Sequence, residues 1–373
     1  MATSSQSTVG KVIAIDFYCS SCQKQGQWAE FYCKKCLKFY CVKCIIKHGK
    51  KFVKHVPYGI AEKDKWPVPR NELQDLHEDK HIEKFCYIRI ICAEVSVQGD
   101  PDQVFSVEGK SEYDVSKPSD STYDMDTRAI CALSDDQILV ADINNKRLYL
   151  LDHQYQVVGH SELSSIPWDI CQIAPNEVAV AVGLNMTYGV QFFSVNGGQL
   201  VNGTMFTCQH QCLGIAYNLQ HLYLTSGTAL YKYSMIGDLL NKLYEDTSRW
   251  LGLTVYKCAV SPSGDKIFIT NFEHDKVLTL ATDGSVLHTF TDPDLRGPGG
   301  IHVTDLGQVL VSGFSPGIFT ILQLDGEGKK KLATLATERD GLCRLESVCY
   351  NRGTASIIVA RVLSNKILVF KVK

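Results

Sequence analysis

Long apolar runs are absent from this sequence of 373 residues. No run reaches the ~18 residues that a membrane-spanning helix needs, so we expect no membrane segment. The first residues, MATSSQSTVGKVIAIDF, lack a basic start followed by a long apolar stretch and a small-residue cleavage site, and so do not resemble a secretion signal. We therefore expect a cytoplasmic protein, in which the glycosylation sequons at Asn185 and Asn202 stay unused.

Catalytic motifs are scarce, and each candidate lacks its structural context. His77–His81 fits the HExxH pattern of zinc proteases but lies in a short polar linker with no catalytic domain around it. Gly313–Gly317 fits the G-x-S-x-G nucleophile elbow, yet Pro316 and Gly317 lead into an apolar strand rather than a helix, which predicts a hairpin turn. GEGKKK at 326–331 lacks the spacing of a phosphate-binding loop and predicts a basic turn. We expect no enzyme.

The formal net charge of −2 is small, but its distribution is uneven. Residues 1–92 contain 16 Lys and Arg against 9 Asp and Glu, whereas residues 93–373 contain 22 against 31. A basic N-terminal part can attract an acidic partner or phosphate, although such an excess usually marks a solvated surface.

The chain is rich in cysteine, with 15 residues, and six of these form three Cys-x2-Cys pairs followed by two histidines. Two residues between thiolates allow both sulfurs to bind one metal, and four such ligands complete a tetrahedral zinc site. Eight ligands predict two closed, structural Zn²⁺ sites with no position left for a catalytic water. The predicted ligands are Cys19, Cys22, Cys33, Cys36, Cys41, Cys44, His48 and His55.

Residues 15–57 contain too little apolar mass for a hydrophobic core, so metal binding must supply the folding energy of this segment. The other nine cysteines are scattered singly, as expected for small hydrophobic residues in a reducing compartment. Residues 1–14 are expected to be disordered.

The run CSSCQKQGQWAEFYCKKCLKFYCVKCIIKHGKKFVKH resembles a type 1 B-box of the tripartite-motif family. The resemblance implies interleaved ligands: Cys19, Cys22, Cys41 and Cys44 hold one zinc ion, and Cys33, Cys36, His48 and His55 hold the other. Family ligases begin with a RING finger, but residues 1–18 contain neither Cys nor His.

A degenerate second B-box is expected in the linker at 58–92. Gln74 replaces its first cysteine and Arg89 replaces the partner of Cys86. Whether His77, His81, Cys86 and Cys92 bind any metal stays open.

From residue 129 onward, one pattern of short apolar strands and polar turns recurs six times. Its starting positions are separated by 40 to 47 residues, the period of a four-stranded propeller blade. No stretch has the 3.6-residue spacing of a helical solenoid, and no Trp-Asp ends each unit as in WD40 repeats. Residues 93–373 are thus predicted to form a six-bladed β-propeller, and the fold class is mostly β. The starting positions are Ile130, Ile170, Ile215, Cys258, Ile301 and Val348.

The phrase QILVADINNKRLYLLD resembles an NHL repeat, and NHL propellers form the C-terminal half of several tripartite-motif relatives. The coiled coil that normally joins the B-box to the propeller is missing. The polar stretch at 111–127 predicts a flexible loop. The last blade has only three strands, which leaves an exposed sheet edge. We expect Ala93–Val97 or Gln103–Val107 to supply its fourth strand.

We expect a non-catalytic interaction protein, because propeller loops converge on one rigid face. The family suggests two alternatives: an accessory role in ubiquitin ligation beside a RING-bearing partner, and RNA binding that regulates mRNA. An enzymatic propeller with a central metal is the least favoured class. A protein partner is expected, RNA is an alternative, and neither membrane nor DNA is expected. The predicted partner-binding residues lie in the loops after the second strands and between blades: Asn145, Tyr188, Arg249, Trp250, His274, Arg296, Phe314 and Arg344.

Overall fold

The computed structural model describes residues 103–116, 125–133, 135–218, 221–249, 252–315 and 317–373, with residues 31–33, 38–40, 45, 47–48 and 58–59 of the N-terminal part. The chain divides into two compact units, Met1–Ser96 and Val97–Lys373. In the first unit, β1 (Phe31–Cys33) pairs antiparallel with β2 (Lys38–Tyr40) and with β3 (Tyr58–Gly59).

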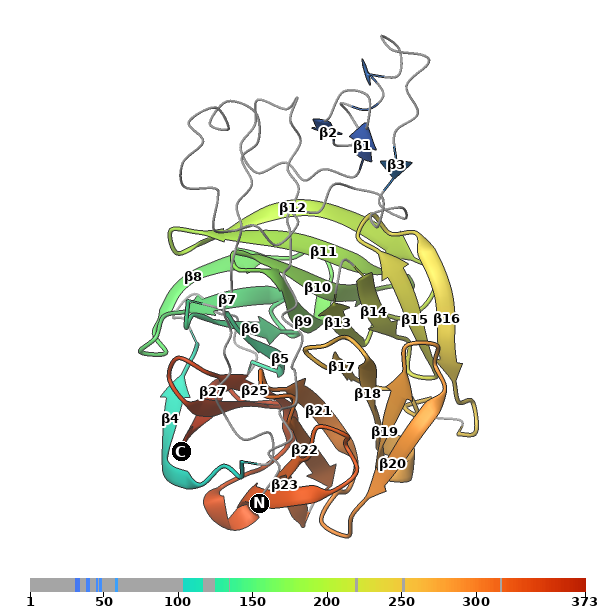
Figure 1. Cartoon of the computed structure of the whole chain (residues 1–373). Helices are drawn as coiled ribbons and strands as arrows, with labels where there is room; N and C mark the ends of the chain where they lie inside the picture. The colour runs from blue at the N-terminus through green and yellow to red at the C-terminus, as the bar shows by residue number, and fades with distance from the viewer. Residues whose placement is uncertain are drawn as a thin grey trace, which may run out of the picture. The chain divides into compact units, whose positions relative to one another are not determined.

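The second unit is a six-bladed β-propeller, as predicted (Figure 1). Each blade is a four-stranded antiparallel sheet whose first strand lies nearest the centre of the ring. Blades 1 to 3 consist of β5 (Thr127–Ala132), β6 (Ile138–Asp142), β7 (Arg147–Leu151) and β8 (Val157–Glu162); β9 (Ile166–Ala174), β10 (Glu177–Leu184), β11 (Thr187–Asn196) and β12 (Gln199–Cys208); and β13 (Gly214–Asn218), β14 (His221–Thr225), β15 (Ala229–Ser234) and β16 (Leu239–Glu245).

Blades 4 to 6 follow the same plan, except that the last one takes its outer strand from the start of the unit. They consist of β17 (Cys258–Val260), β18 (Lys266–Asn271), β19 (Lys276–Ala281) and β20 (Val286–Thr291); β21 (Pro298–Val303), β22 (Val309–Ser315), β23 (Ile318–Leu324) and β24 (Lys331–Thr337); and β25 (Leu345–Asn351), β26 (Ser356–Arg361), β27 (Lys366–Val372) and β4 (Val107–Asp114).

The second and third strands of each blade are apolar along most of their length because the sheet is covered on both sides. All five residues of β6 are buried, as are the last four of β7. Successive side chains of a strand point to opposite sides of its sheet, so a strand between two blades needs apolar residues at every position. The outer strands lie at the periphery, and β16 contains no buried residue.

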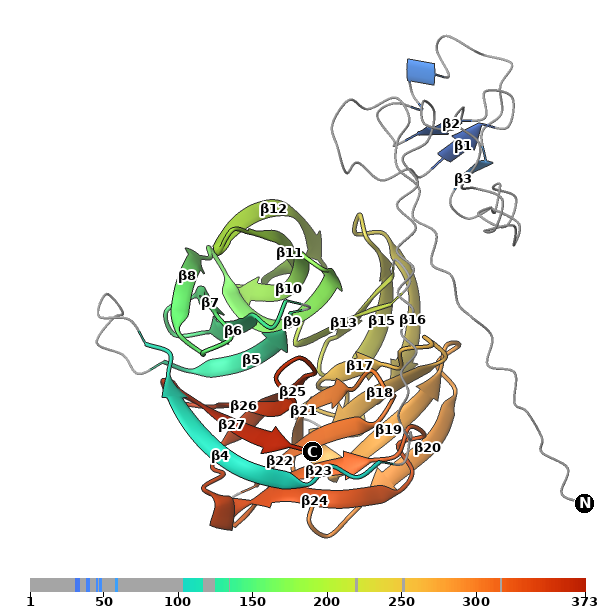
Figure 2. The same ribbon diagram turned by 60° about the vertical axis from the view of Figure 1, so that its left-hand side comes forward.

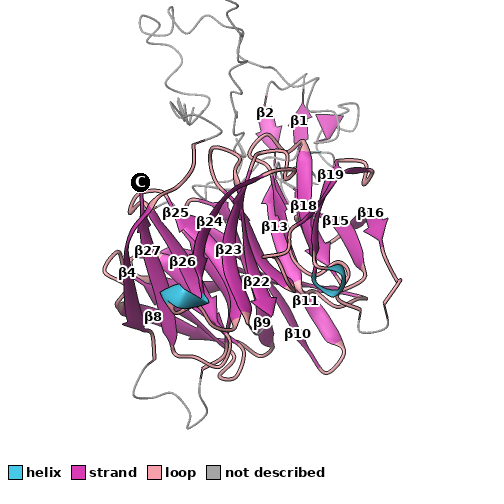
Figure 3. Cartoon of the chain, turned by 90° about the horizontal axis from the view of Figure 1, so that it is seen from below, coloured by secondary structure: helices cyan, strands magenta, loops and turns pink. Residues whose placement is uncertain are grey.

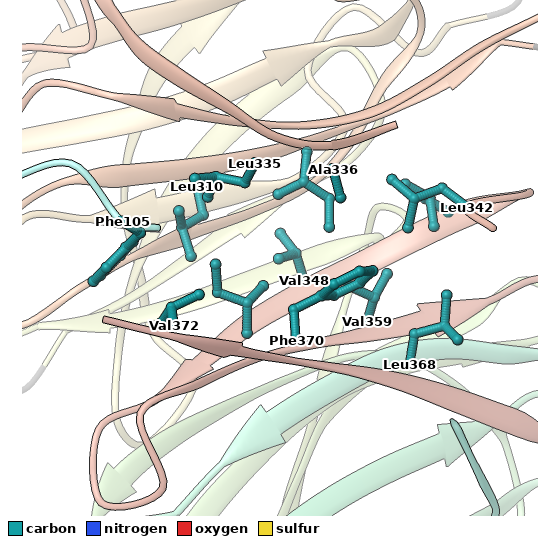
Figure 4. Close-up of a cluster of buried hydrophobic side chains, with 13 residues drawn as sticks. Phe105, Leu310, Leu335, Ala336, Leu342, Val348, Val359, Leu368, Phe370 and Val372 are labelled. Carbon is teal, nitrogen blue, oxygen red and sulfur yellow. The ribbon is translucent and has the colours of Figure 1, made fainter. Parts of the chain in front are cut away.

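Six hydrophobic clusters form the core, one between each pair of neighbouring blades. Figure 4 shows the cluster between blades 5 and 6, in which Phe370 is 1% exposed and Leu310 fully buried. Phe105 joins this cluster from before β4 and stacks on Tyr350 with ring centroids 5.0 Å apart. The core thus closes around the ring without a gap.

The prediction that an N-terminal segment completes the last blade is confirmed, although the strand itself was placed too early. β4 pairs antiparallel with β27, from Val107 opposite Val372 to Asp114 opposite Lys366 (Figure 2). The strand begins at Val107, the last residue of the predicted Gln103–Val107, and Ser106 exchanges two backbone hydrogen bonds with Lys373, each of 3.0 Å. The other predicted segment, Ala93–Val97, lies outside the described residues.

The loop predicted at 111–127 is wrong at its beginning, because residues 111–114 belong to β4. This strand is exposed on both sides and needs no apolar alternation, since its contribution is backbone pairing with β27. The turns predicted at Gly313–Gly317 and 326–331 are confirmed: the first pattern runs from the end of β22 into the connection to β23, and the second runs from the connection after β23 to the first residue of β24. Helix is confined, among the described propeller residues, to the short 3-10 turns η3 (Phe272–His274) and η4 (Glu338–Asp340) (Figure 3).

Candidate functional site

The predicted zinc ligands fall almost entirely outside the described residues. Cys33 is described only as the last residue of β1, and His48 is the one predicted ligand whose side chain is described. His48 is 5% exposed and lies against Tyr40, with ring centroids 4.7 Å apart. His77, His81, Cys86 and Cys92 also lie outside the described residues. Both zinc sites therefore stay predictions.

The predicted partner-binding residues belong to one end of the propeller. Because each blade is an antiparallel meander, the start of its first strand lies at the same end as the turn between its second and third strands. We call this end the top face and the opposite end the bottom face. Seven of the eight residues lie at the top face, and Trp250 lies outside the described residues. Their role in partner binding is not tested by their position.

Four of these residues gather on blades 4 and 5. Arg249 donates from Nε to His274 Nε2 at 3.3 Å, and His274 belongs to η3. Arg296 forms an ion pair with Asp275 at 2.8 Å, and its carbonyl accepts from the Phe314 amide. The remaining three are separate from this group in the ring, with Asn145 on blade 1, Tyr188 on blade 2 and Arg344 before blade 6.

A group of buried or partly buried ionisable side chains lies at the centre of the top face, where the first strands begin. We call it the central cluster; it consists of Asp126, Arg128, Asp169, Tyr256, Lys257 and Glu346. Arg128 forms ion pairs with Asp126 at 3.1 Å and with Glu346 at 3.6 Å. The Tyr256 hydroxyl donates to Glu346 Oε1. Tyr256 precedes blade 4 and Glu346 lies in blade 6, so this hydrogen bond crosses the ring past blade 5.

A second cross-ring link joins blades 4 and 2. Lys257 Nζ donates to the Trp168 carbonyl at 2.6 Å and lies 3.5 Å from Asp169 Oδ1. The other carboxylate oxygen of Asp169 accepts from the amide of Ile215, the second residue of β13, at 3.0 Å. Lys257 is 3% exposed, so its charge is neutralised inside the protein rather than by solvent.

Burial and neighbouring charge shift the proton affinities in this cluster. Burial raises the pKa of Tyr256 well above its usual value, and the Glu346 carboxylate adds to the effect. Burial also raises the pKa of Asp169, against the opposing charge of Lys257. Burial alone would lower the pKa of Arg128, but the carboxylates of Glu346 and Asp126 outweigh it and raise that pKa. Tyr256 therefore stays protonated and Arg128 charged near neutral pH.

Half-buried aromatic rings surround the central cluster. Trp168 and Tyr188 both approach Gly183: a Cβ there would lie 2.6 Å from the Tyr188 ring and 3.4 Å from Trp168 Nε1. On blades 4 and 5, the centroid of the Phe272 ring lies 6.0 Å from that of Tyr256 and 6.1 Å from that of Phe314. The top face thus presents aromatic surface from blades 2, 4 and 5.

Two exposed apolar side chains at this face stand on strained backbone. Met186, in the turn before β11, is 84% exposed with φ 64°, and Leu363, before β27, is 53% exposed with φ 53°. Left-handed backbone costs a non-glycine residue about 1–2 kcal/mol. The Leu363 amide donates to Asp126 Oδ1 at 3.2 Å, so the central cluster holds this turn in place.

Reasoning from the sequence missed the central cluster, although the signal is visible in the repeats. Arg128, Trp168, Tyr256 and Glu346 each stand two residues before the repeat starts Ile130, Ile170, Cys258 and Val348. A charged or large aromatic residue at the start of a buried strand needs a partner, and four of them at one repeat position must converge at the centre of the ring.

Two searches of the described residues bear on other function classes. No group of three or more His, Cys, Asp and Glu side chains there could hold a metal ion. None of the helices among the described residues is long and apolar enough to cross a membrane.

Comparison with known proteins shows the fold alone. No protein-family model matches the chain, and no curated protein matches it. A solved virginiamycin B lyase from Staphylococcus aureus is 10% identical, with 72% of this chain and 99% of that chain covered and a TM-score of 0.51. A catalytically inactive form of that lyase with quinupristin is 11% identical, with 72% of this chain and 99% of that chain covered and a TM-score of 0.52. A Bacteroides thetaiotaomicron protein of unknown function is also 11% identical, with 72% of this chain and 73% of that chain covered and a TM-score of 0.52. These likenesses support the β-propeller architecture.

Proposed function

We propose that this chain is a non-catalytic interaction protein that binds a protein partner at the top face of its propeller and carries a two-zinc B-box module of the tripartite-motif type. The observation that carries the first part is the pair of exposed apolar residues, Met186 and Leu363, held in left-handed backbone at the top face, with the Tyr188 hydroxyl 3.6 Å from the Met186 sulfur. Exposed apolar and aromatic side chains on a rigid surface are typical of protein interfaces.

The central cluster supports a structural role more than a catalytic one. Its ionisable groups engage one another: Arg128 with two carboxylates, Tyr256 with Glu346, and Lys257 with Asp169. An acid–base catalyst needs a group that can meet a substrate, whereas these side chains link blades 6, 1, 2 and 4 across the ring. No specific observation favours RNA over protein, because the Arg296 guanidinium is already paired with Asp275.

The zinc part of the proposal rests on the donor set and on two details of the first unit. In the β1–β2 hairpin, Cys33 pairs with Lys38, so Cys36 belongs to the four residues that connect the strands. A Cys-x2-Cys pair beside a hairpin turn suits one tetrahedral zinc ion. The buried side chain of His48, against Tyr40, suits a ligand in a closed site. The ions would be structural and would fold the module.

Substitutions that relax backbone strain test the top face without harming the fold. Leu363→Gly and Met186→Gly should each raise the free energy of unfolding by up to ~1 kcal/mol, because glycine adopts a left-handed φ freely. The same changes should reduce partner binding, since they remove the exposed side chains. Ala355→Gly is the matched control, with φ 45° but in the turn between β25 and β26 on the bottom face.

Partner capture supplies the binding measurement. A photo-crosslinking residue at position 186 or 363 should trap the partner, and one at Ile236, which is 70% exposed on the bottom-face turn after β15, should not. If the glycine variants capture the same partner as strongly as the unmodified chain, the top-face assignment is wrong.

A further inference from the structure

The outer edge of blade 2 differs from the other outer edges of the propeller. β12 is ten residues long, and its sequence, QLVNGTMFTC, contains no charged residue. Four other outer strands, β4, β8, β16 and β24, carry Lys, Asp or Glu, and β20 carries His288, which lies 3.7 Å from Glu327. Charges on edge strands prevent pairing with other chains. β12 lacks this protection, and at ten residues it is longer than β20, the other outer strand without Lys, Arg, Asp or Glu.

The outward side of β12 pairs with no strand among the described residues, since its sheet runs β12-β11-β10-β9. Seven of its ten residues are exposed along the edge, including Val201 at 47% and Met205 at 40%. Gln191 on β11 donates from its side chain to the Gly203 carbonyl at 3.1 Å, where the β11–β12 register shifts. The edge is therefore long and apolar in part, and β12 is held by its hydrogen bonds to β11.

A cavity of about 330 Å³ opens beside this edge, between blades 1 and 2. Its floor includes Val182 and Phe193, which are 1% and 2% exposed. Its polar lining consists of Ser164, Ser165, Gln191, Asn202 and Glu162, whose carboxylate is already ion-paired with Arg147 at 2.8 Å. An apolar floor below hydrogen-bonding groups suits one large aromatic side chain with a polar tip, because the ring needs burial and the hydroxyl needs a partner.

The strand and the cavity are placed to act together. Asn202 and Met205 pair with Phe193 and Gln191 on β11, so their side chains lie on the side of the sheet that faces the cavity. A peptide added to β12 would alternate its side chains between the two sides, and those on this side would meet the cavity opening.

We propose that β12 binds an extended segment of a partner protein as a fifth strand of blade 2, with a tyrosine of that segment in the adjoining cavity. Backbone hydrogen bonds to β12 supply affinity, and the cavity supplies specificity. The cavity reaches the loop between blades 1 and 2 at the top face, but neither Met186 nor Leu363 lines it, so either proposal can fail without the other.

A synthetic peptide tests the proposal directly. The probe is an acetylated nine-residue peptide of alternating threonine and valine, with lysine at both ends and tyrosine at its centre; in the matched probe, serine replaces tyrosine. We expect saturable binding to the full chain and slower amide hydrogen exchange at residues 199–208. The serine probe should bind at least ~10-fold more weakly, because the central aromatic is the anchor.

A paired substitution locates the site. Met205→Lys places a charge on the edge beside the cavity and should weaken binding ~10-fold or more, whereas Val286→Lys on β20, 48% exposed, should not. Four outcomes would overturn the proposal: no saturable binding up to about 1 mM, equal binding of both probes, exchange protection confined to other strands, or unchanged binding by Met205→Lys. Concentration-dependent dimerisation abolished by Met205→Lys would instead assign the edge to a second copy of this chain.

Discussion

The hydrogen bond from Tyr256 to Glu346 crosses the ring, and a double-mutant cycle measures its strength. Both residues are buried, Tyr256 at 7% and Glu346 at 3% exposure. A hydrogen bond to a charged acceptor contributes about 1.5–3 kcal/mol, so Tyr256→Phe should lower the free energy of unfolding by that amount. Glu346→Leu breaks this bond and the ion pair with Arg128, which lies 3.6 Å away.

Breaking a buried ion pair costs about 3–5 kcal/mol when one charge is left alone. Arg128 keeps Asp126 at 3.1 Å, so we expect Glu346→Leu to cost near 3 kcal/mol, the lower end of that range. The double variant removes donor and acceptor together and should be no less stable than Glu346→Leu alone. The coupling energy is then ~2 kcal/mol.

Equilibrium urea unfolding, followed by tryptophan fluorescence and circular dichroism, measures the four proteins of the cycle. Tyr244→Phe is the control, because this half-buried tyrosine on β16 lies outside the central cluster. It should change the free energy of unfolding by no more than ~0.5 kcal/mol. Strictly additive losses in the double variant would refute the cross-ring link, since independent sites add.

Three further predictions concern the ring closure, pH and zinc. Phe105→Ala should lower the free energy of unfolding by about 3–5 kcal/mol, because it empties a buried site just before β4. Val107→Ala, at a residue that is 36% exposed, should lower it by less than ~1 kcal/mol in the same thermal or urea unfolding experiment. Equal effects would contradict closure of the ring by this segment. Burial lowers the pKa of His302 to about 4, against the charge of Asp305. The unfolded chain binds this proton near pH ~6.5, so the free energy of unfolding falls as pH drops from 6.5 towards 4. His302→Gln should therefore lose ~2 kcal/mol less free energy of unfolding than the unmodified chain between pH ~7.5 and ~5. An identical loss in the variant would argue against this role of His302. Finally, elemental analysis should find two zinc ions per chain, and less than one zinc ion per chain would contradict the prediction of two sites. Chelation should unfold the N-terminal module while leaving the thermal midpoint of the propeller unchanged.

The sequence predicted the second strands of the blades well, because a strand that is buried on both sides appears as a continuous apolar run. β6 and β10 are continuous apolar runs, and their recurrence indicated the six-bladed plan. The closing strand was misread because VEGKSEYD is polar and exposed on both sides, and nothing local distinguishes it from a loop. Its pairing with β27 is a property of the closed ring.

The top face was predictable from topology, since the turns after the second strands and between blades must share one end. The contacts within it were not. Tyr256 and Glu346 are 90 residues apart, and only the curvature of the whole ring brings them together. The two strained residues were also missed, because a left-handed turn at Met186 or Leu363 has no glycine to mark it. The zinc ligands lie largely outside the described residues and stay a prediction from spacing.

The closure by β4 has a consequence for synthesis of the protein. Arg361, which forms an ion pair with Glu112 of β4, is translated 249 residues after it. At about 5–20 residues per second, β4 waits roughly 12–50 s before β27 exists. A strand that waits unpaired is exposed to aggregation, and charges flanking or within it suppress this hazard. Glu108, Lys110, Glu112 and Asp114 alternate along β4. The polarity that hid the strand in the sequence thus suits a strand that must stay unpaired until its partner strand is made.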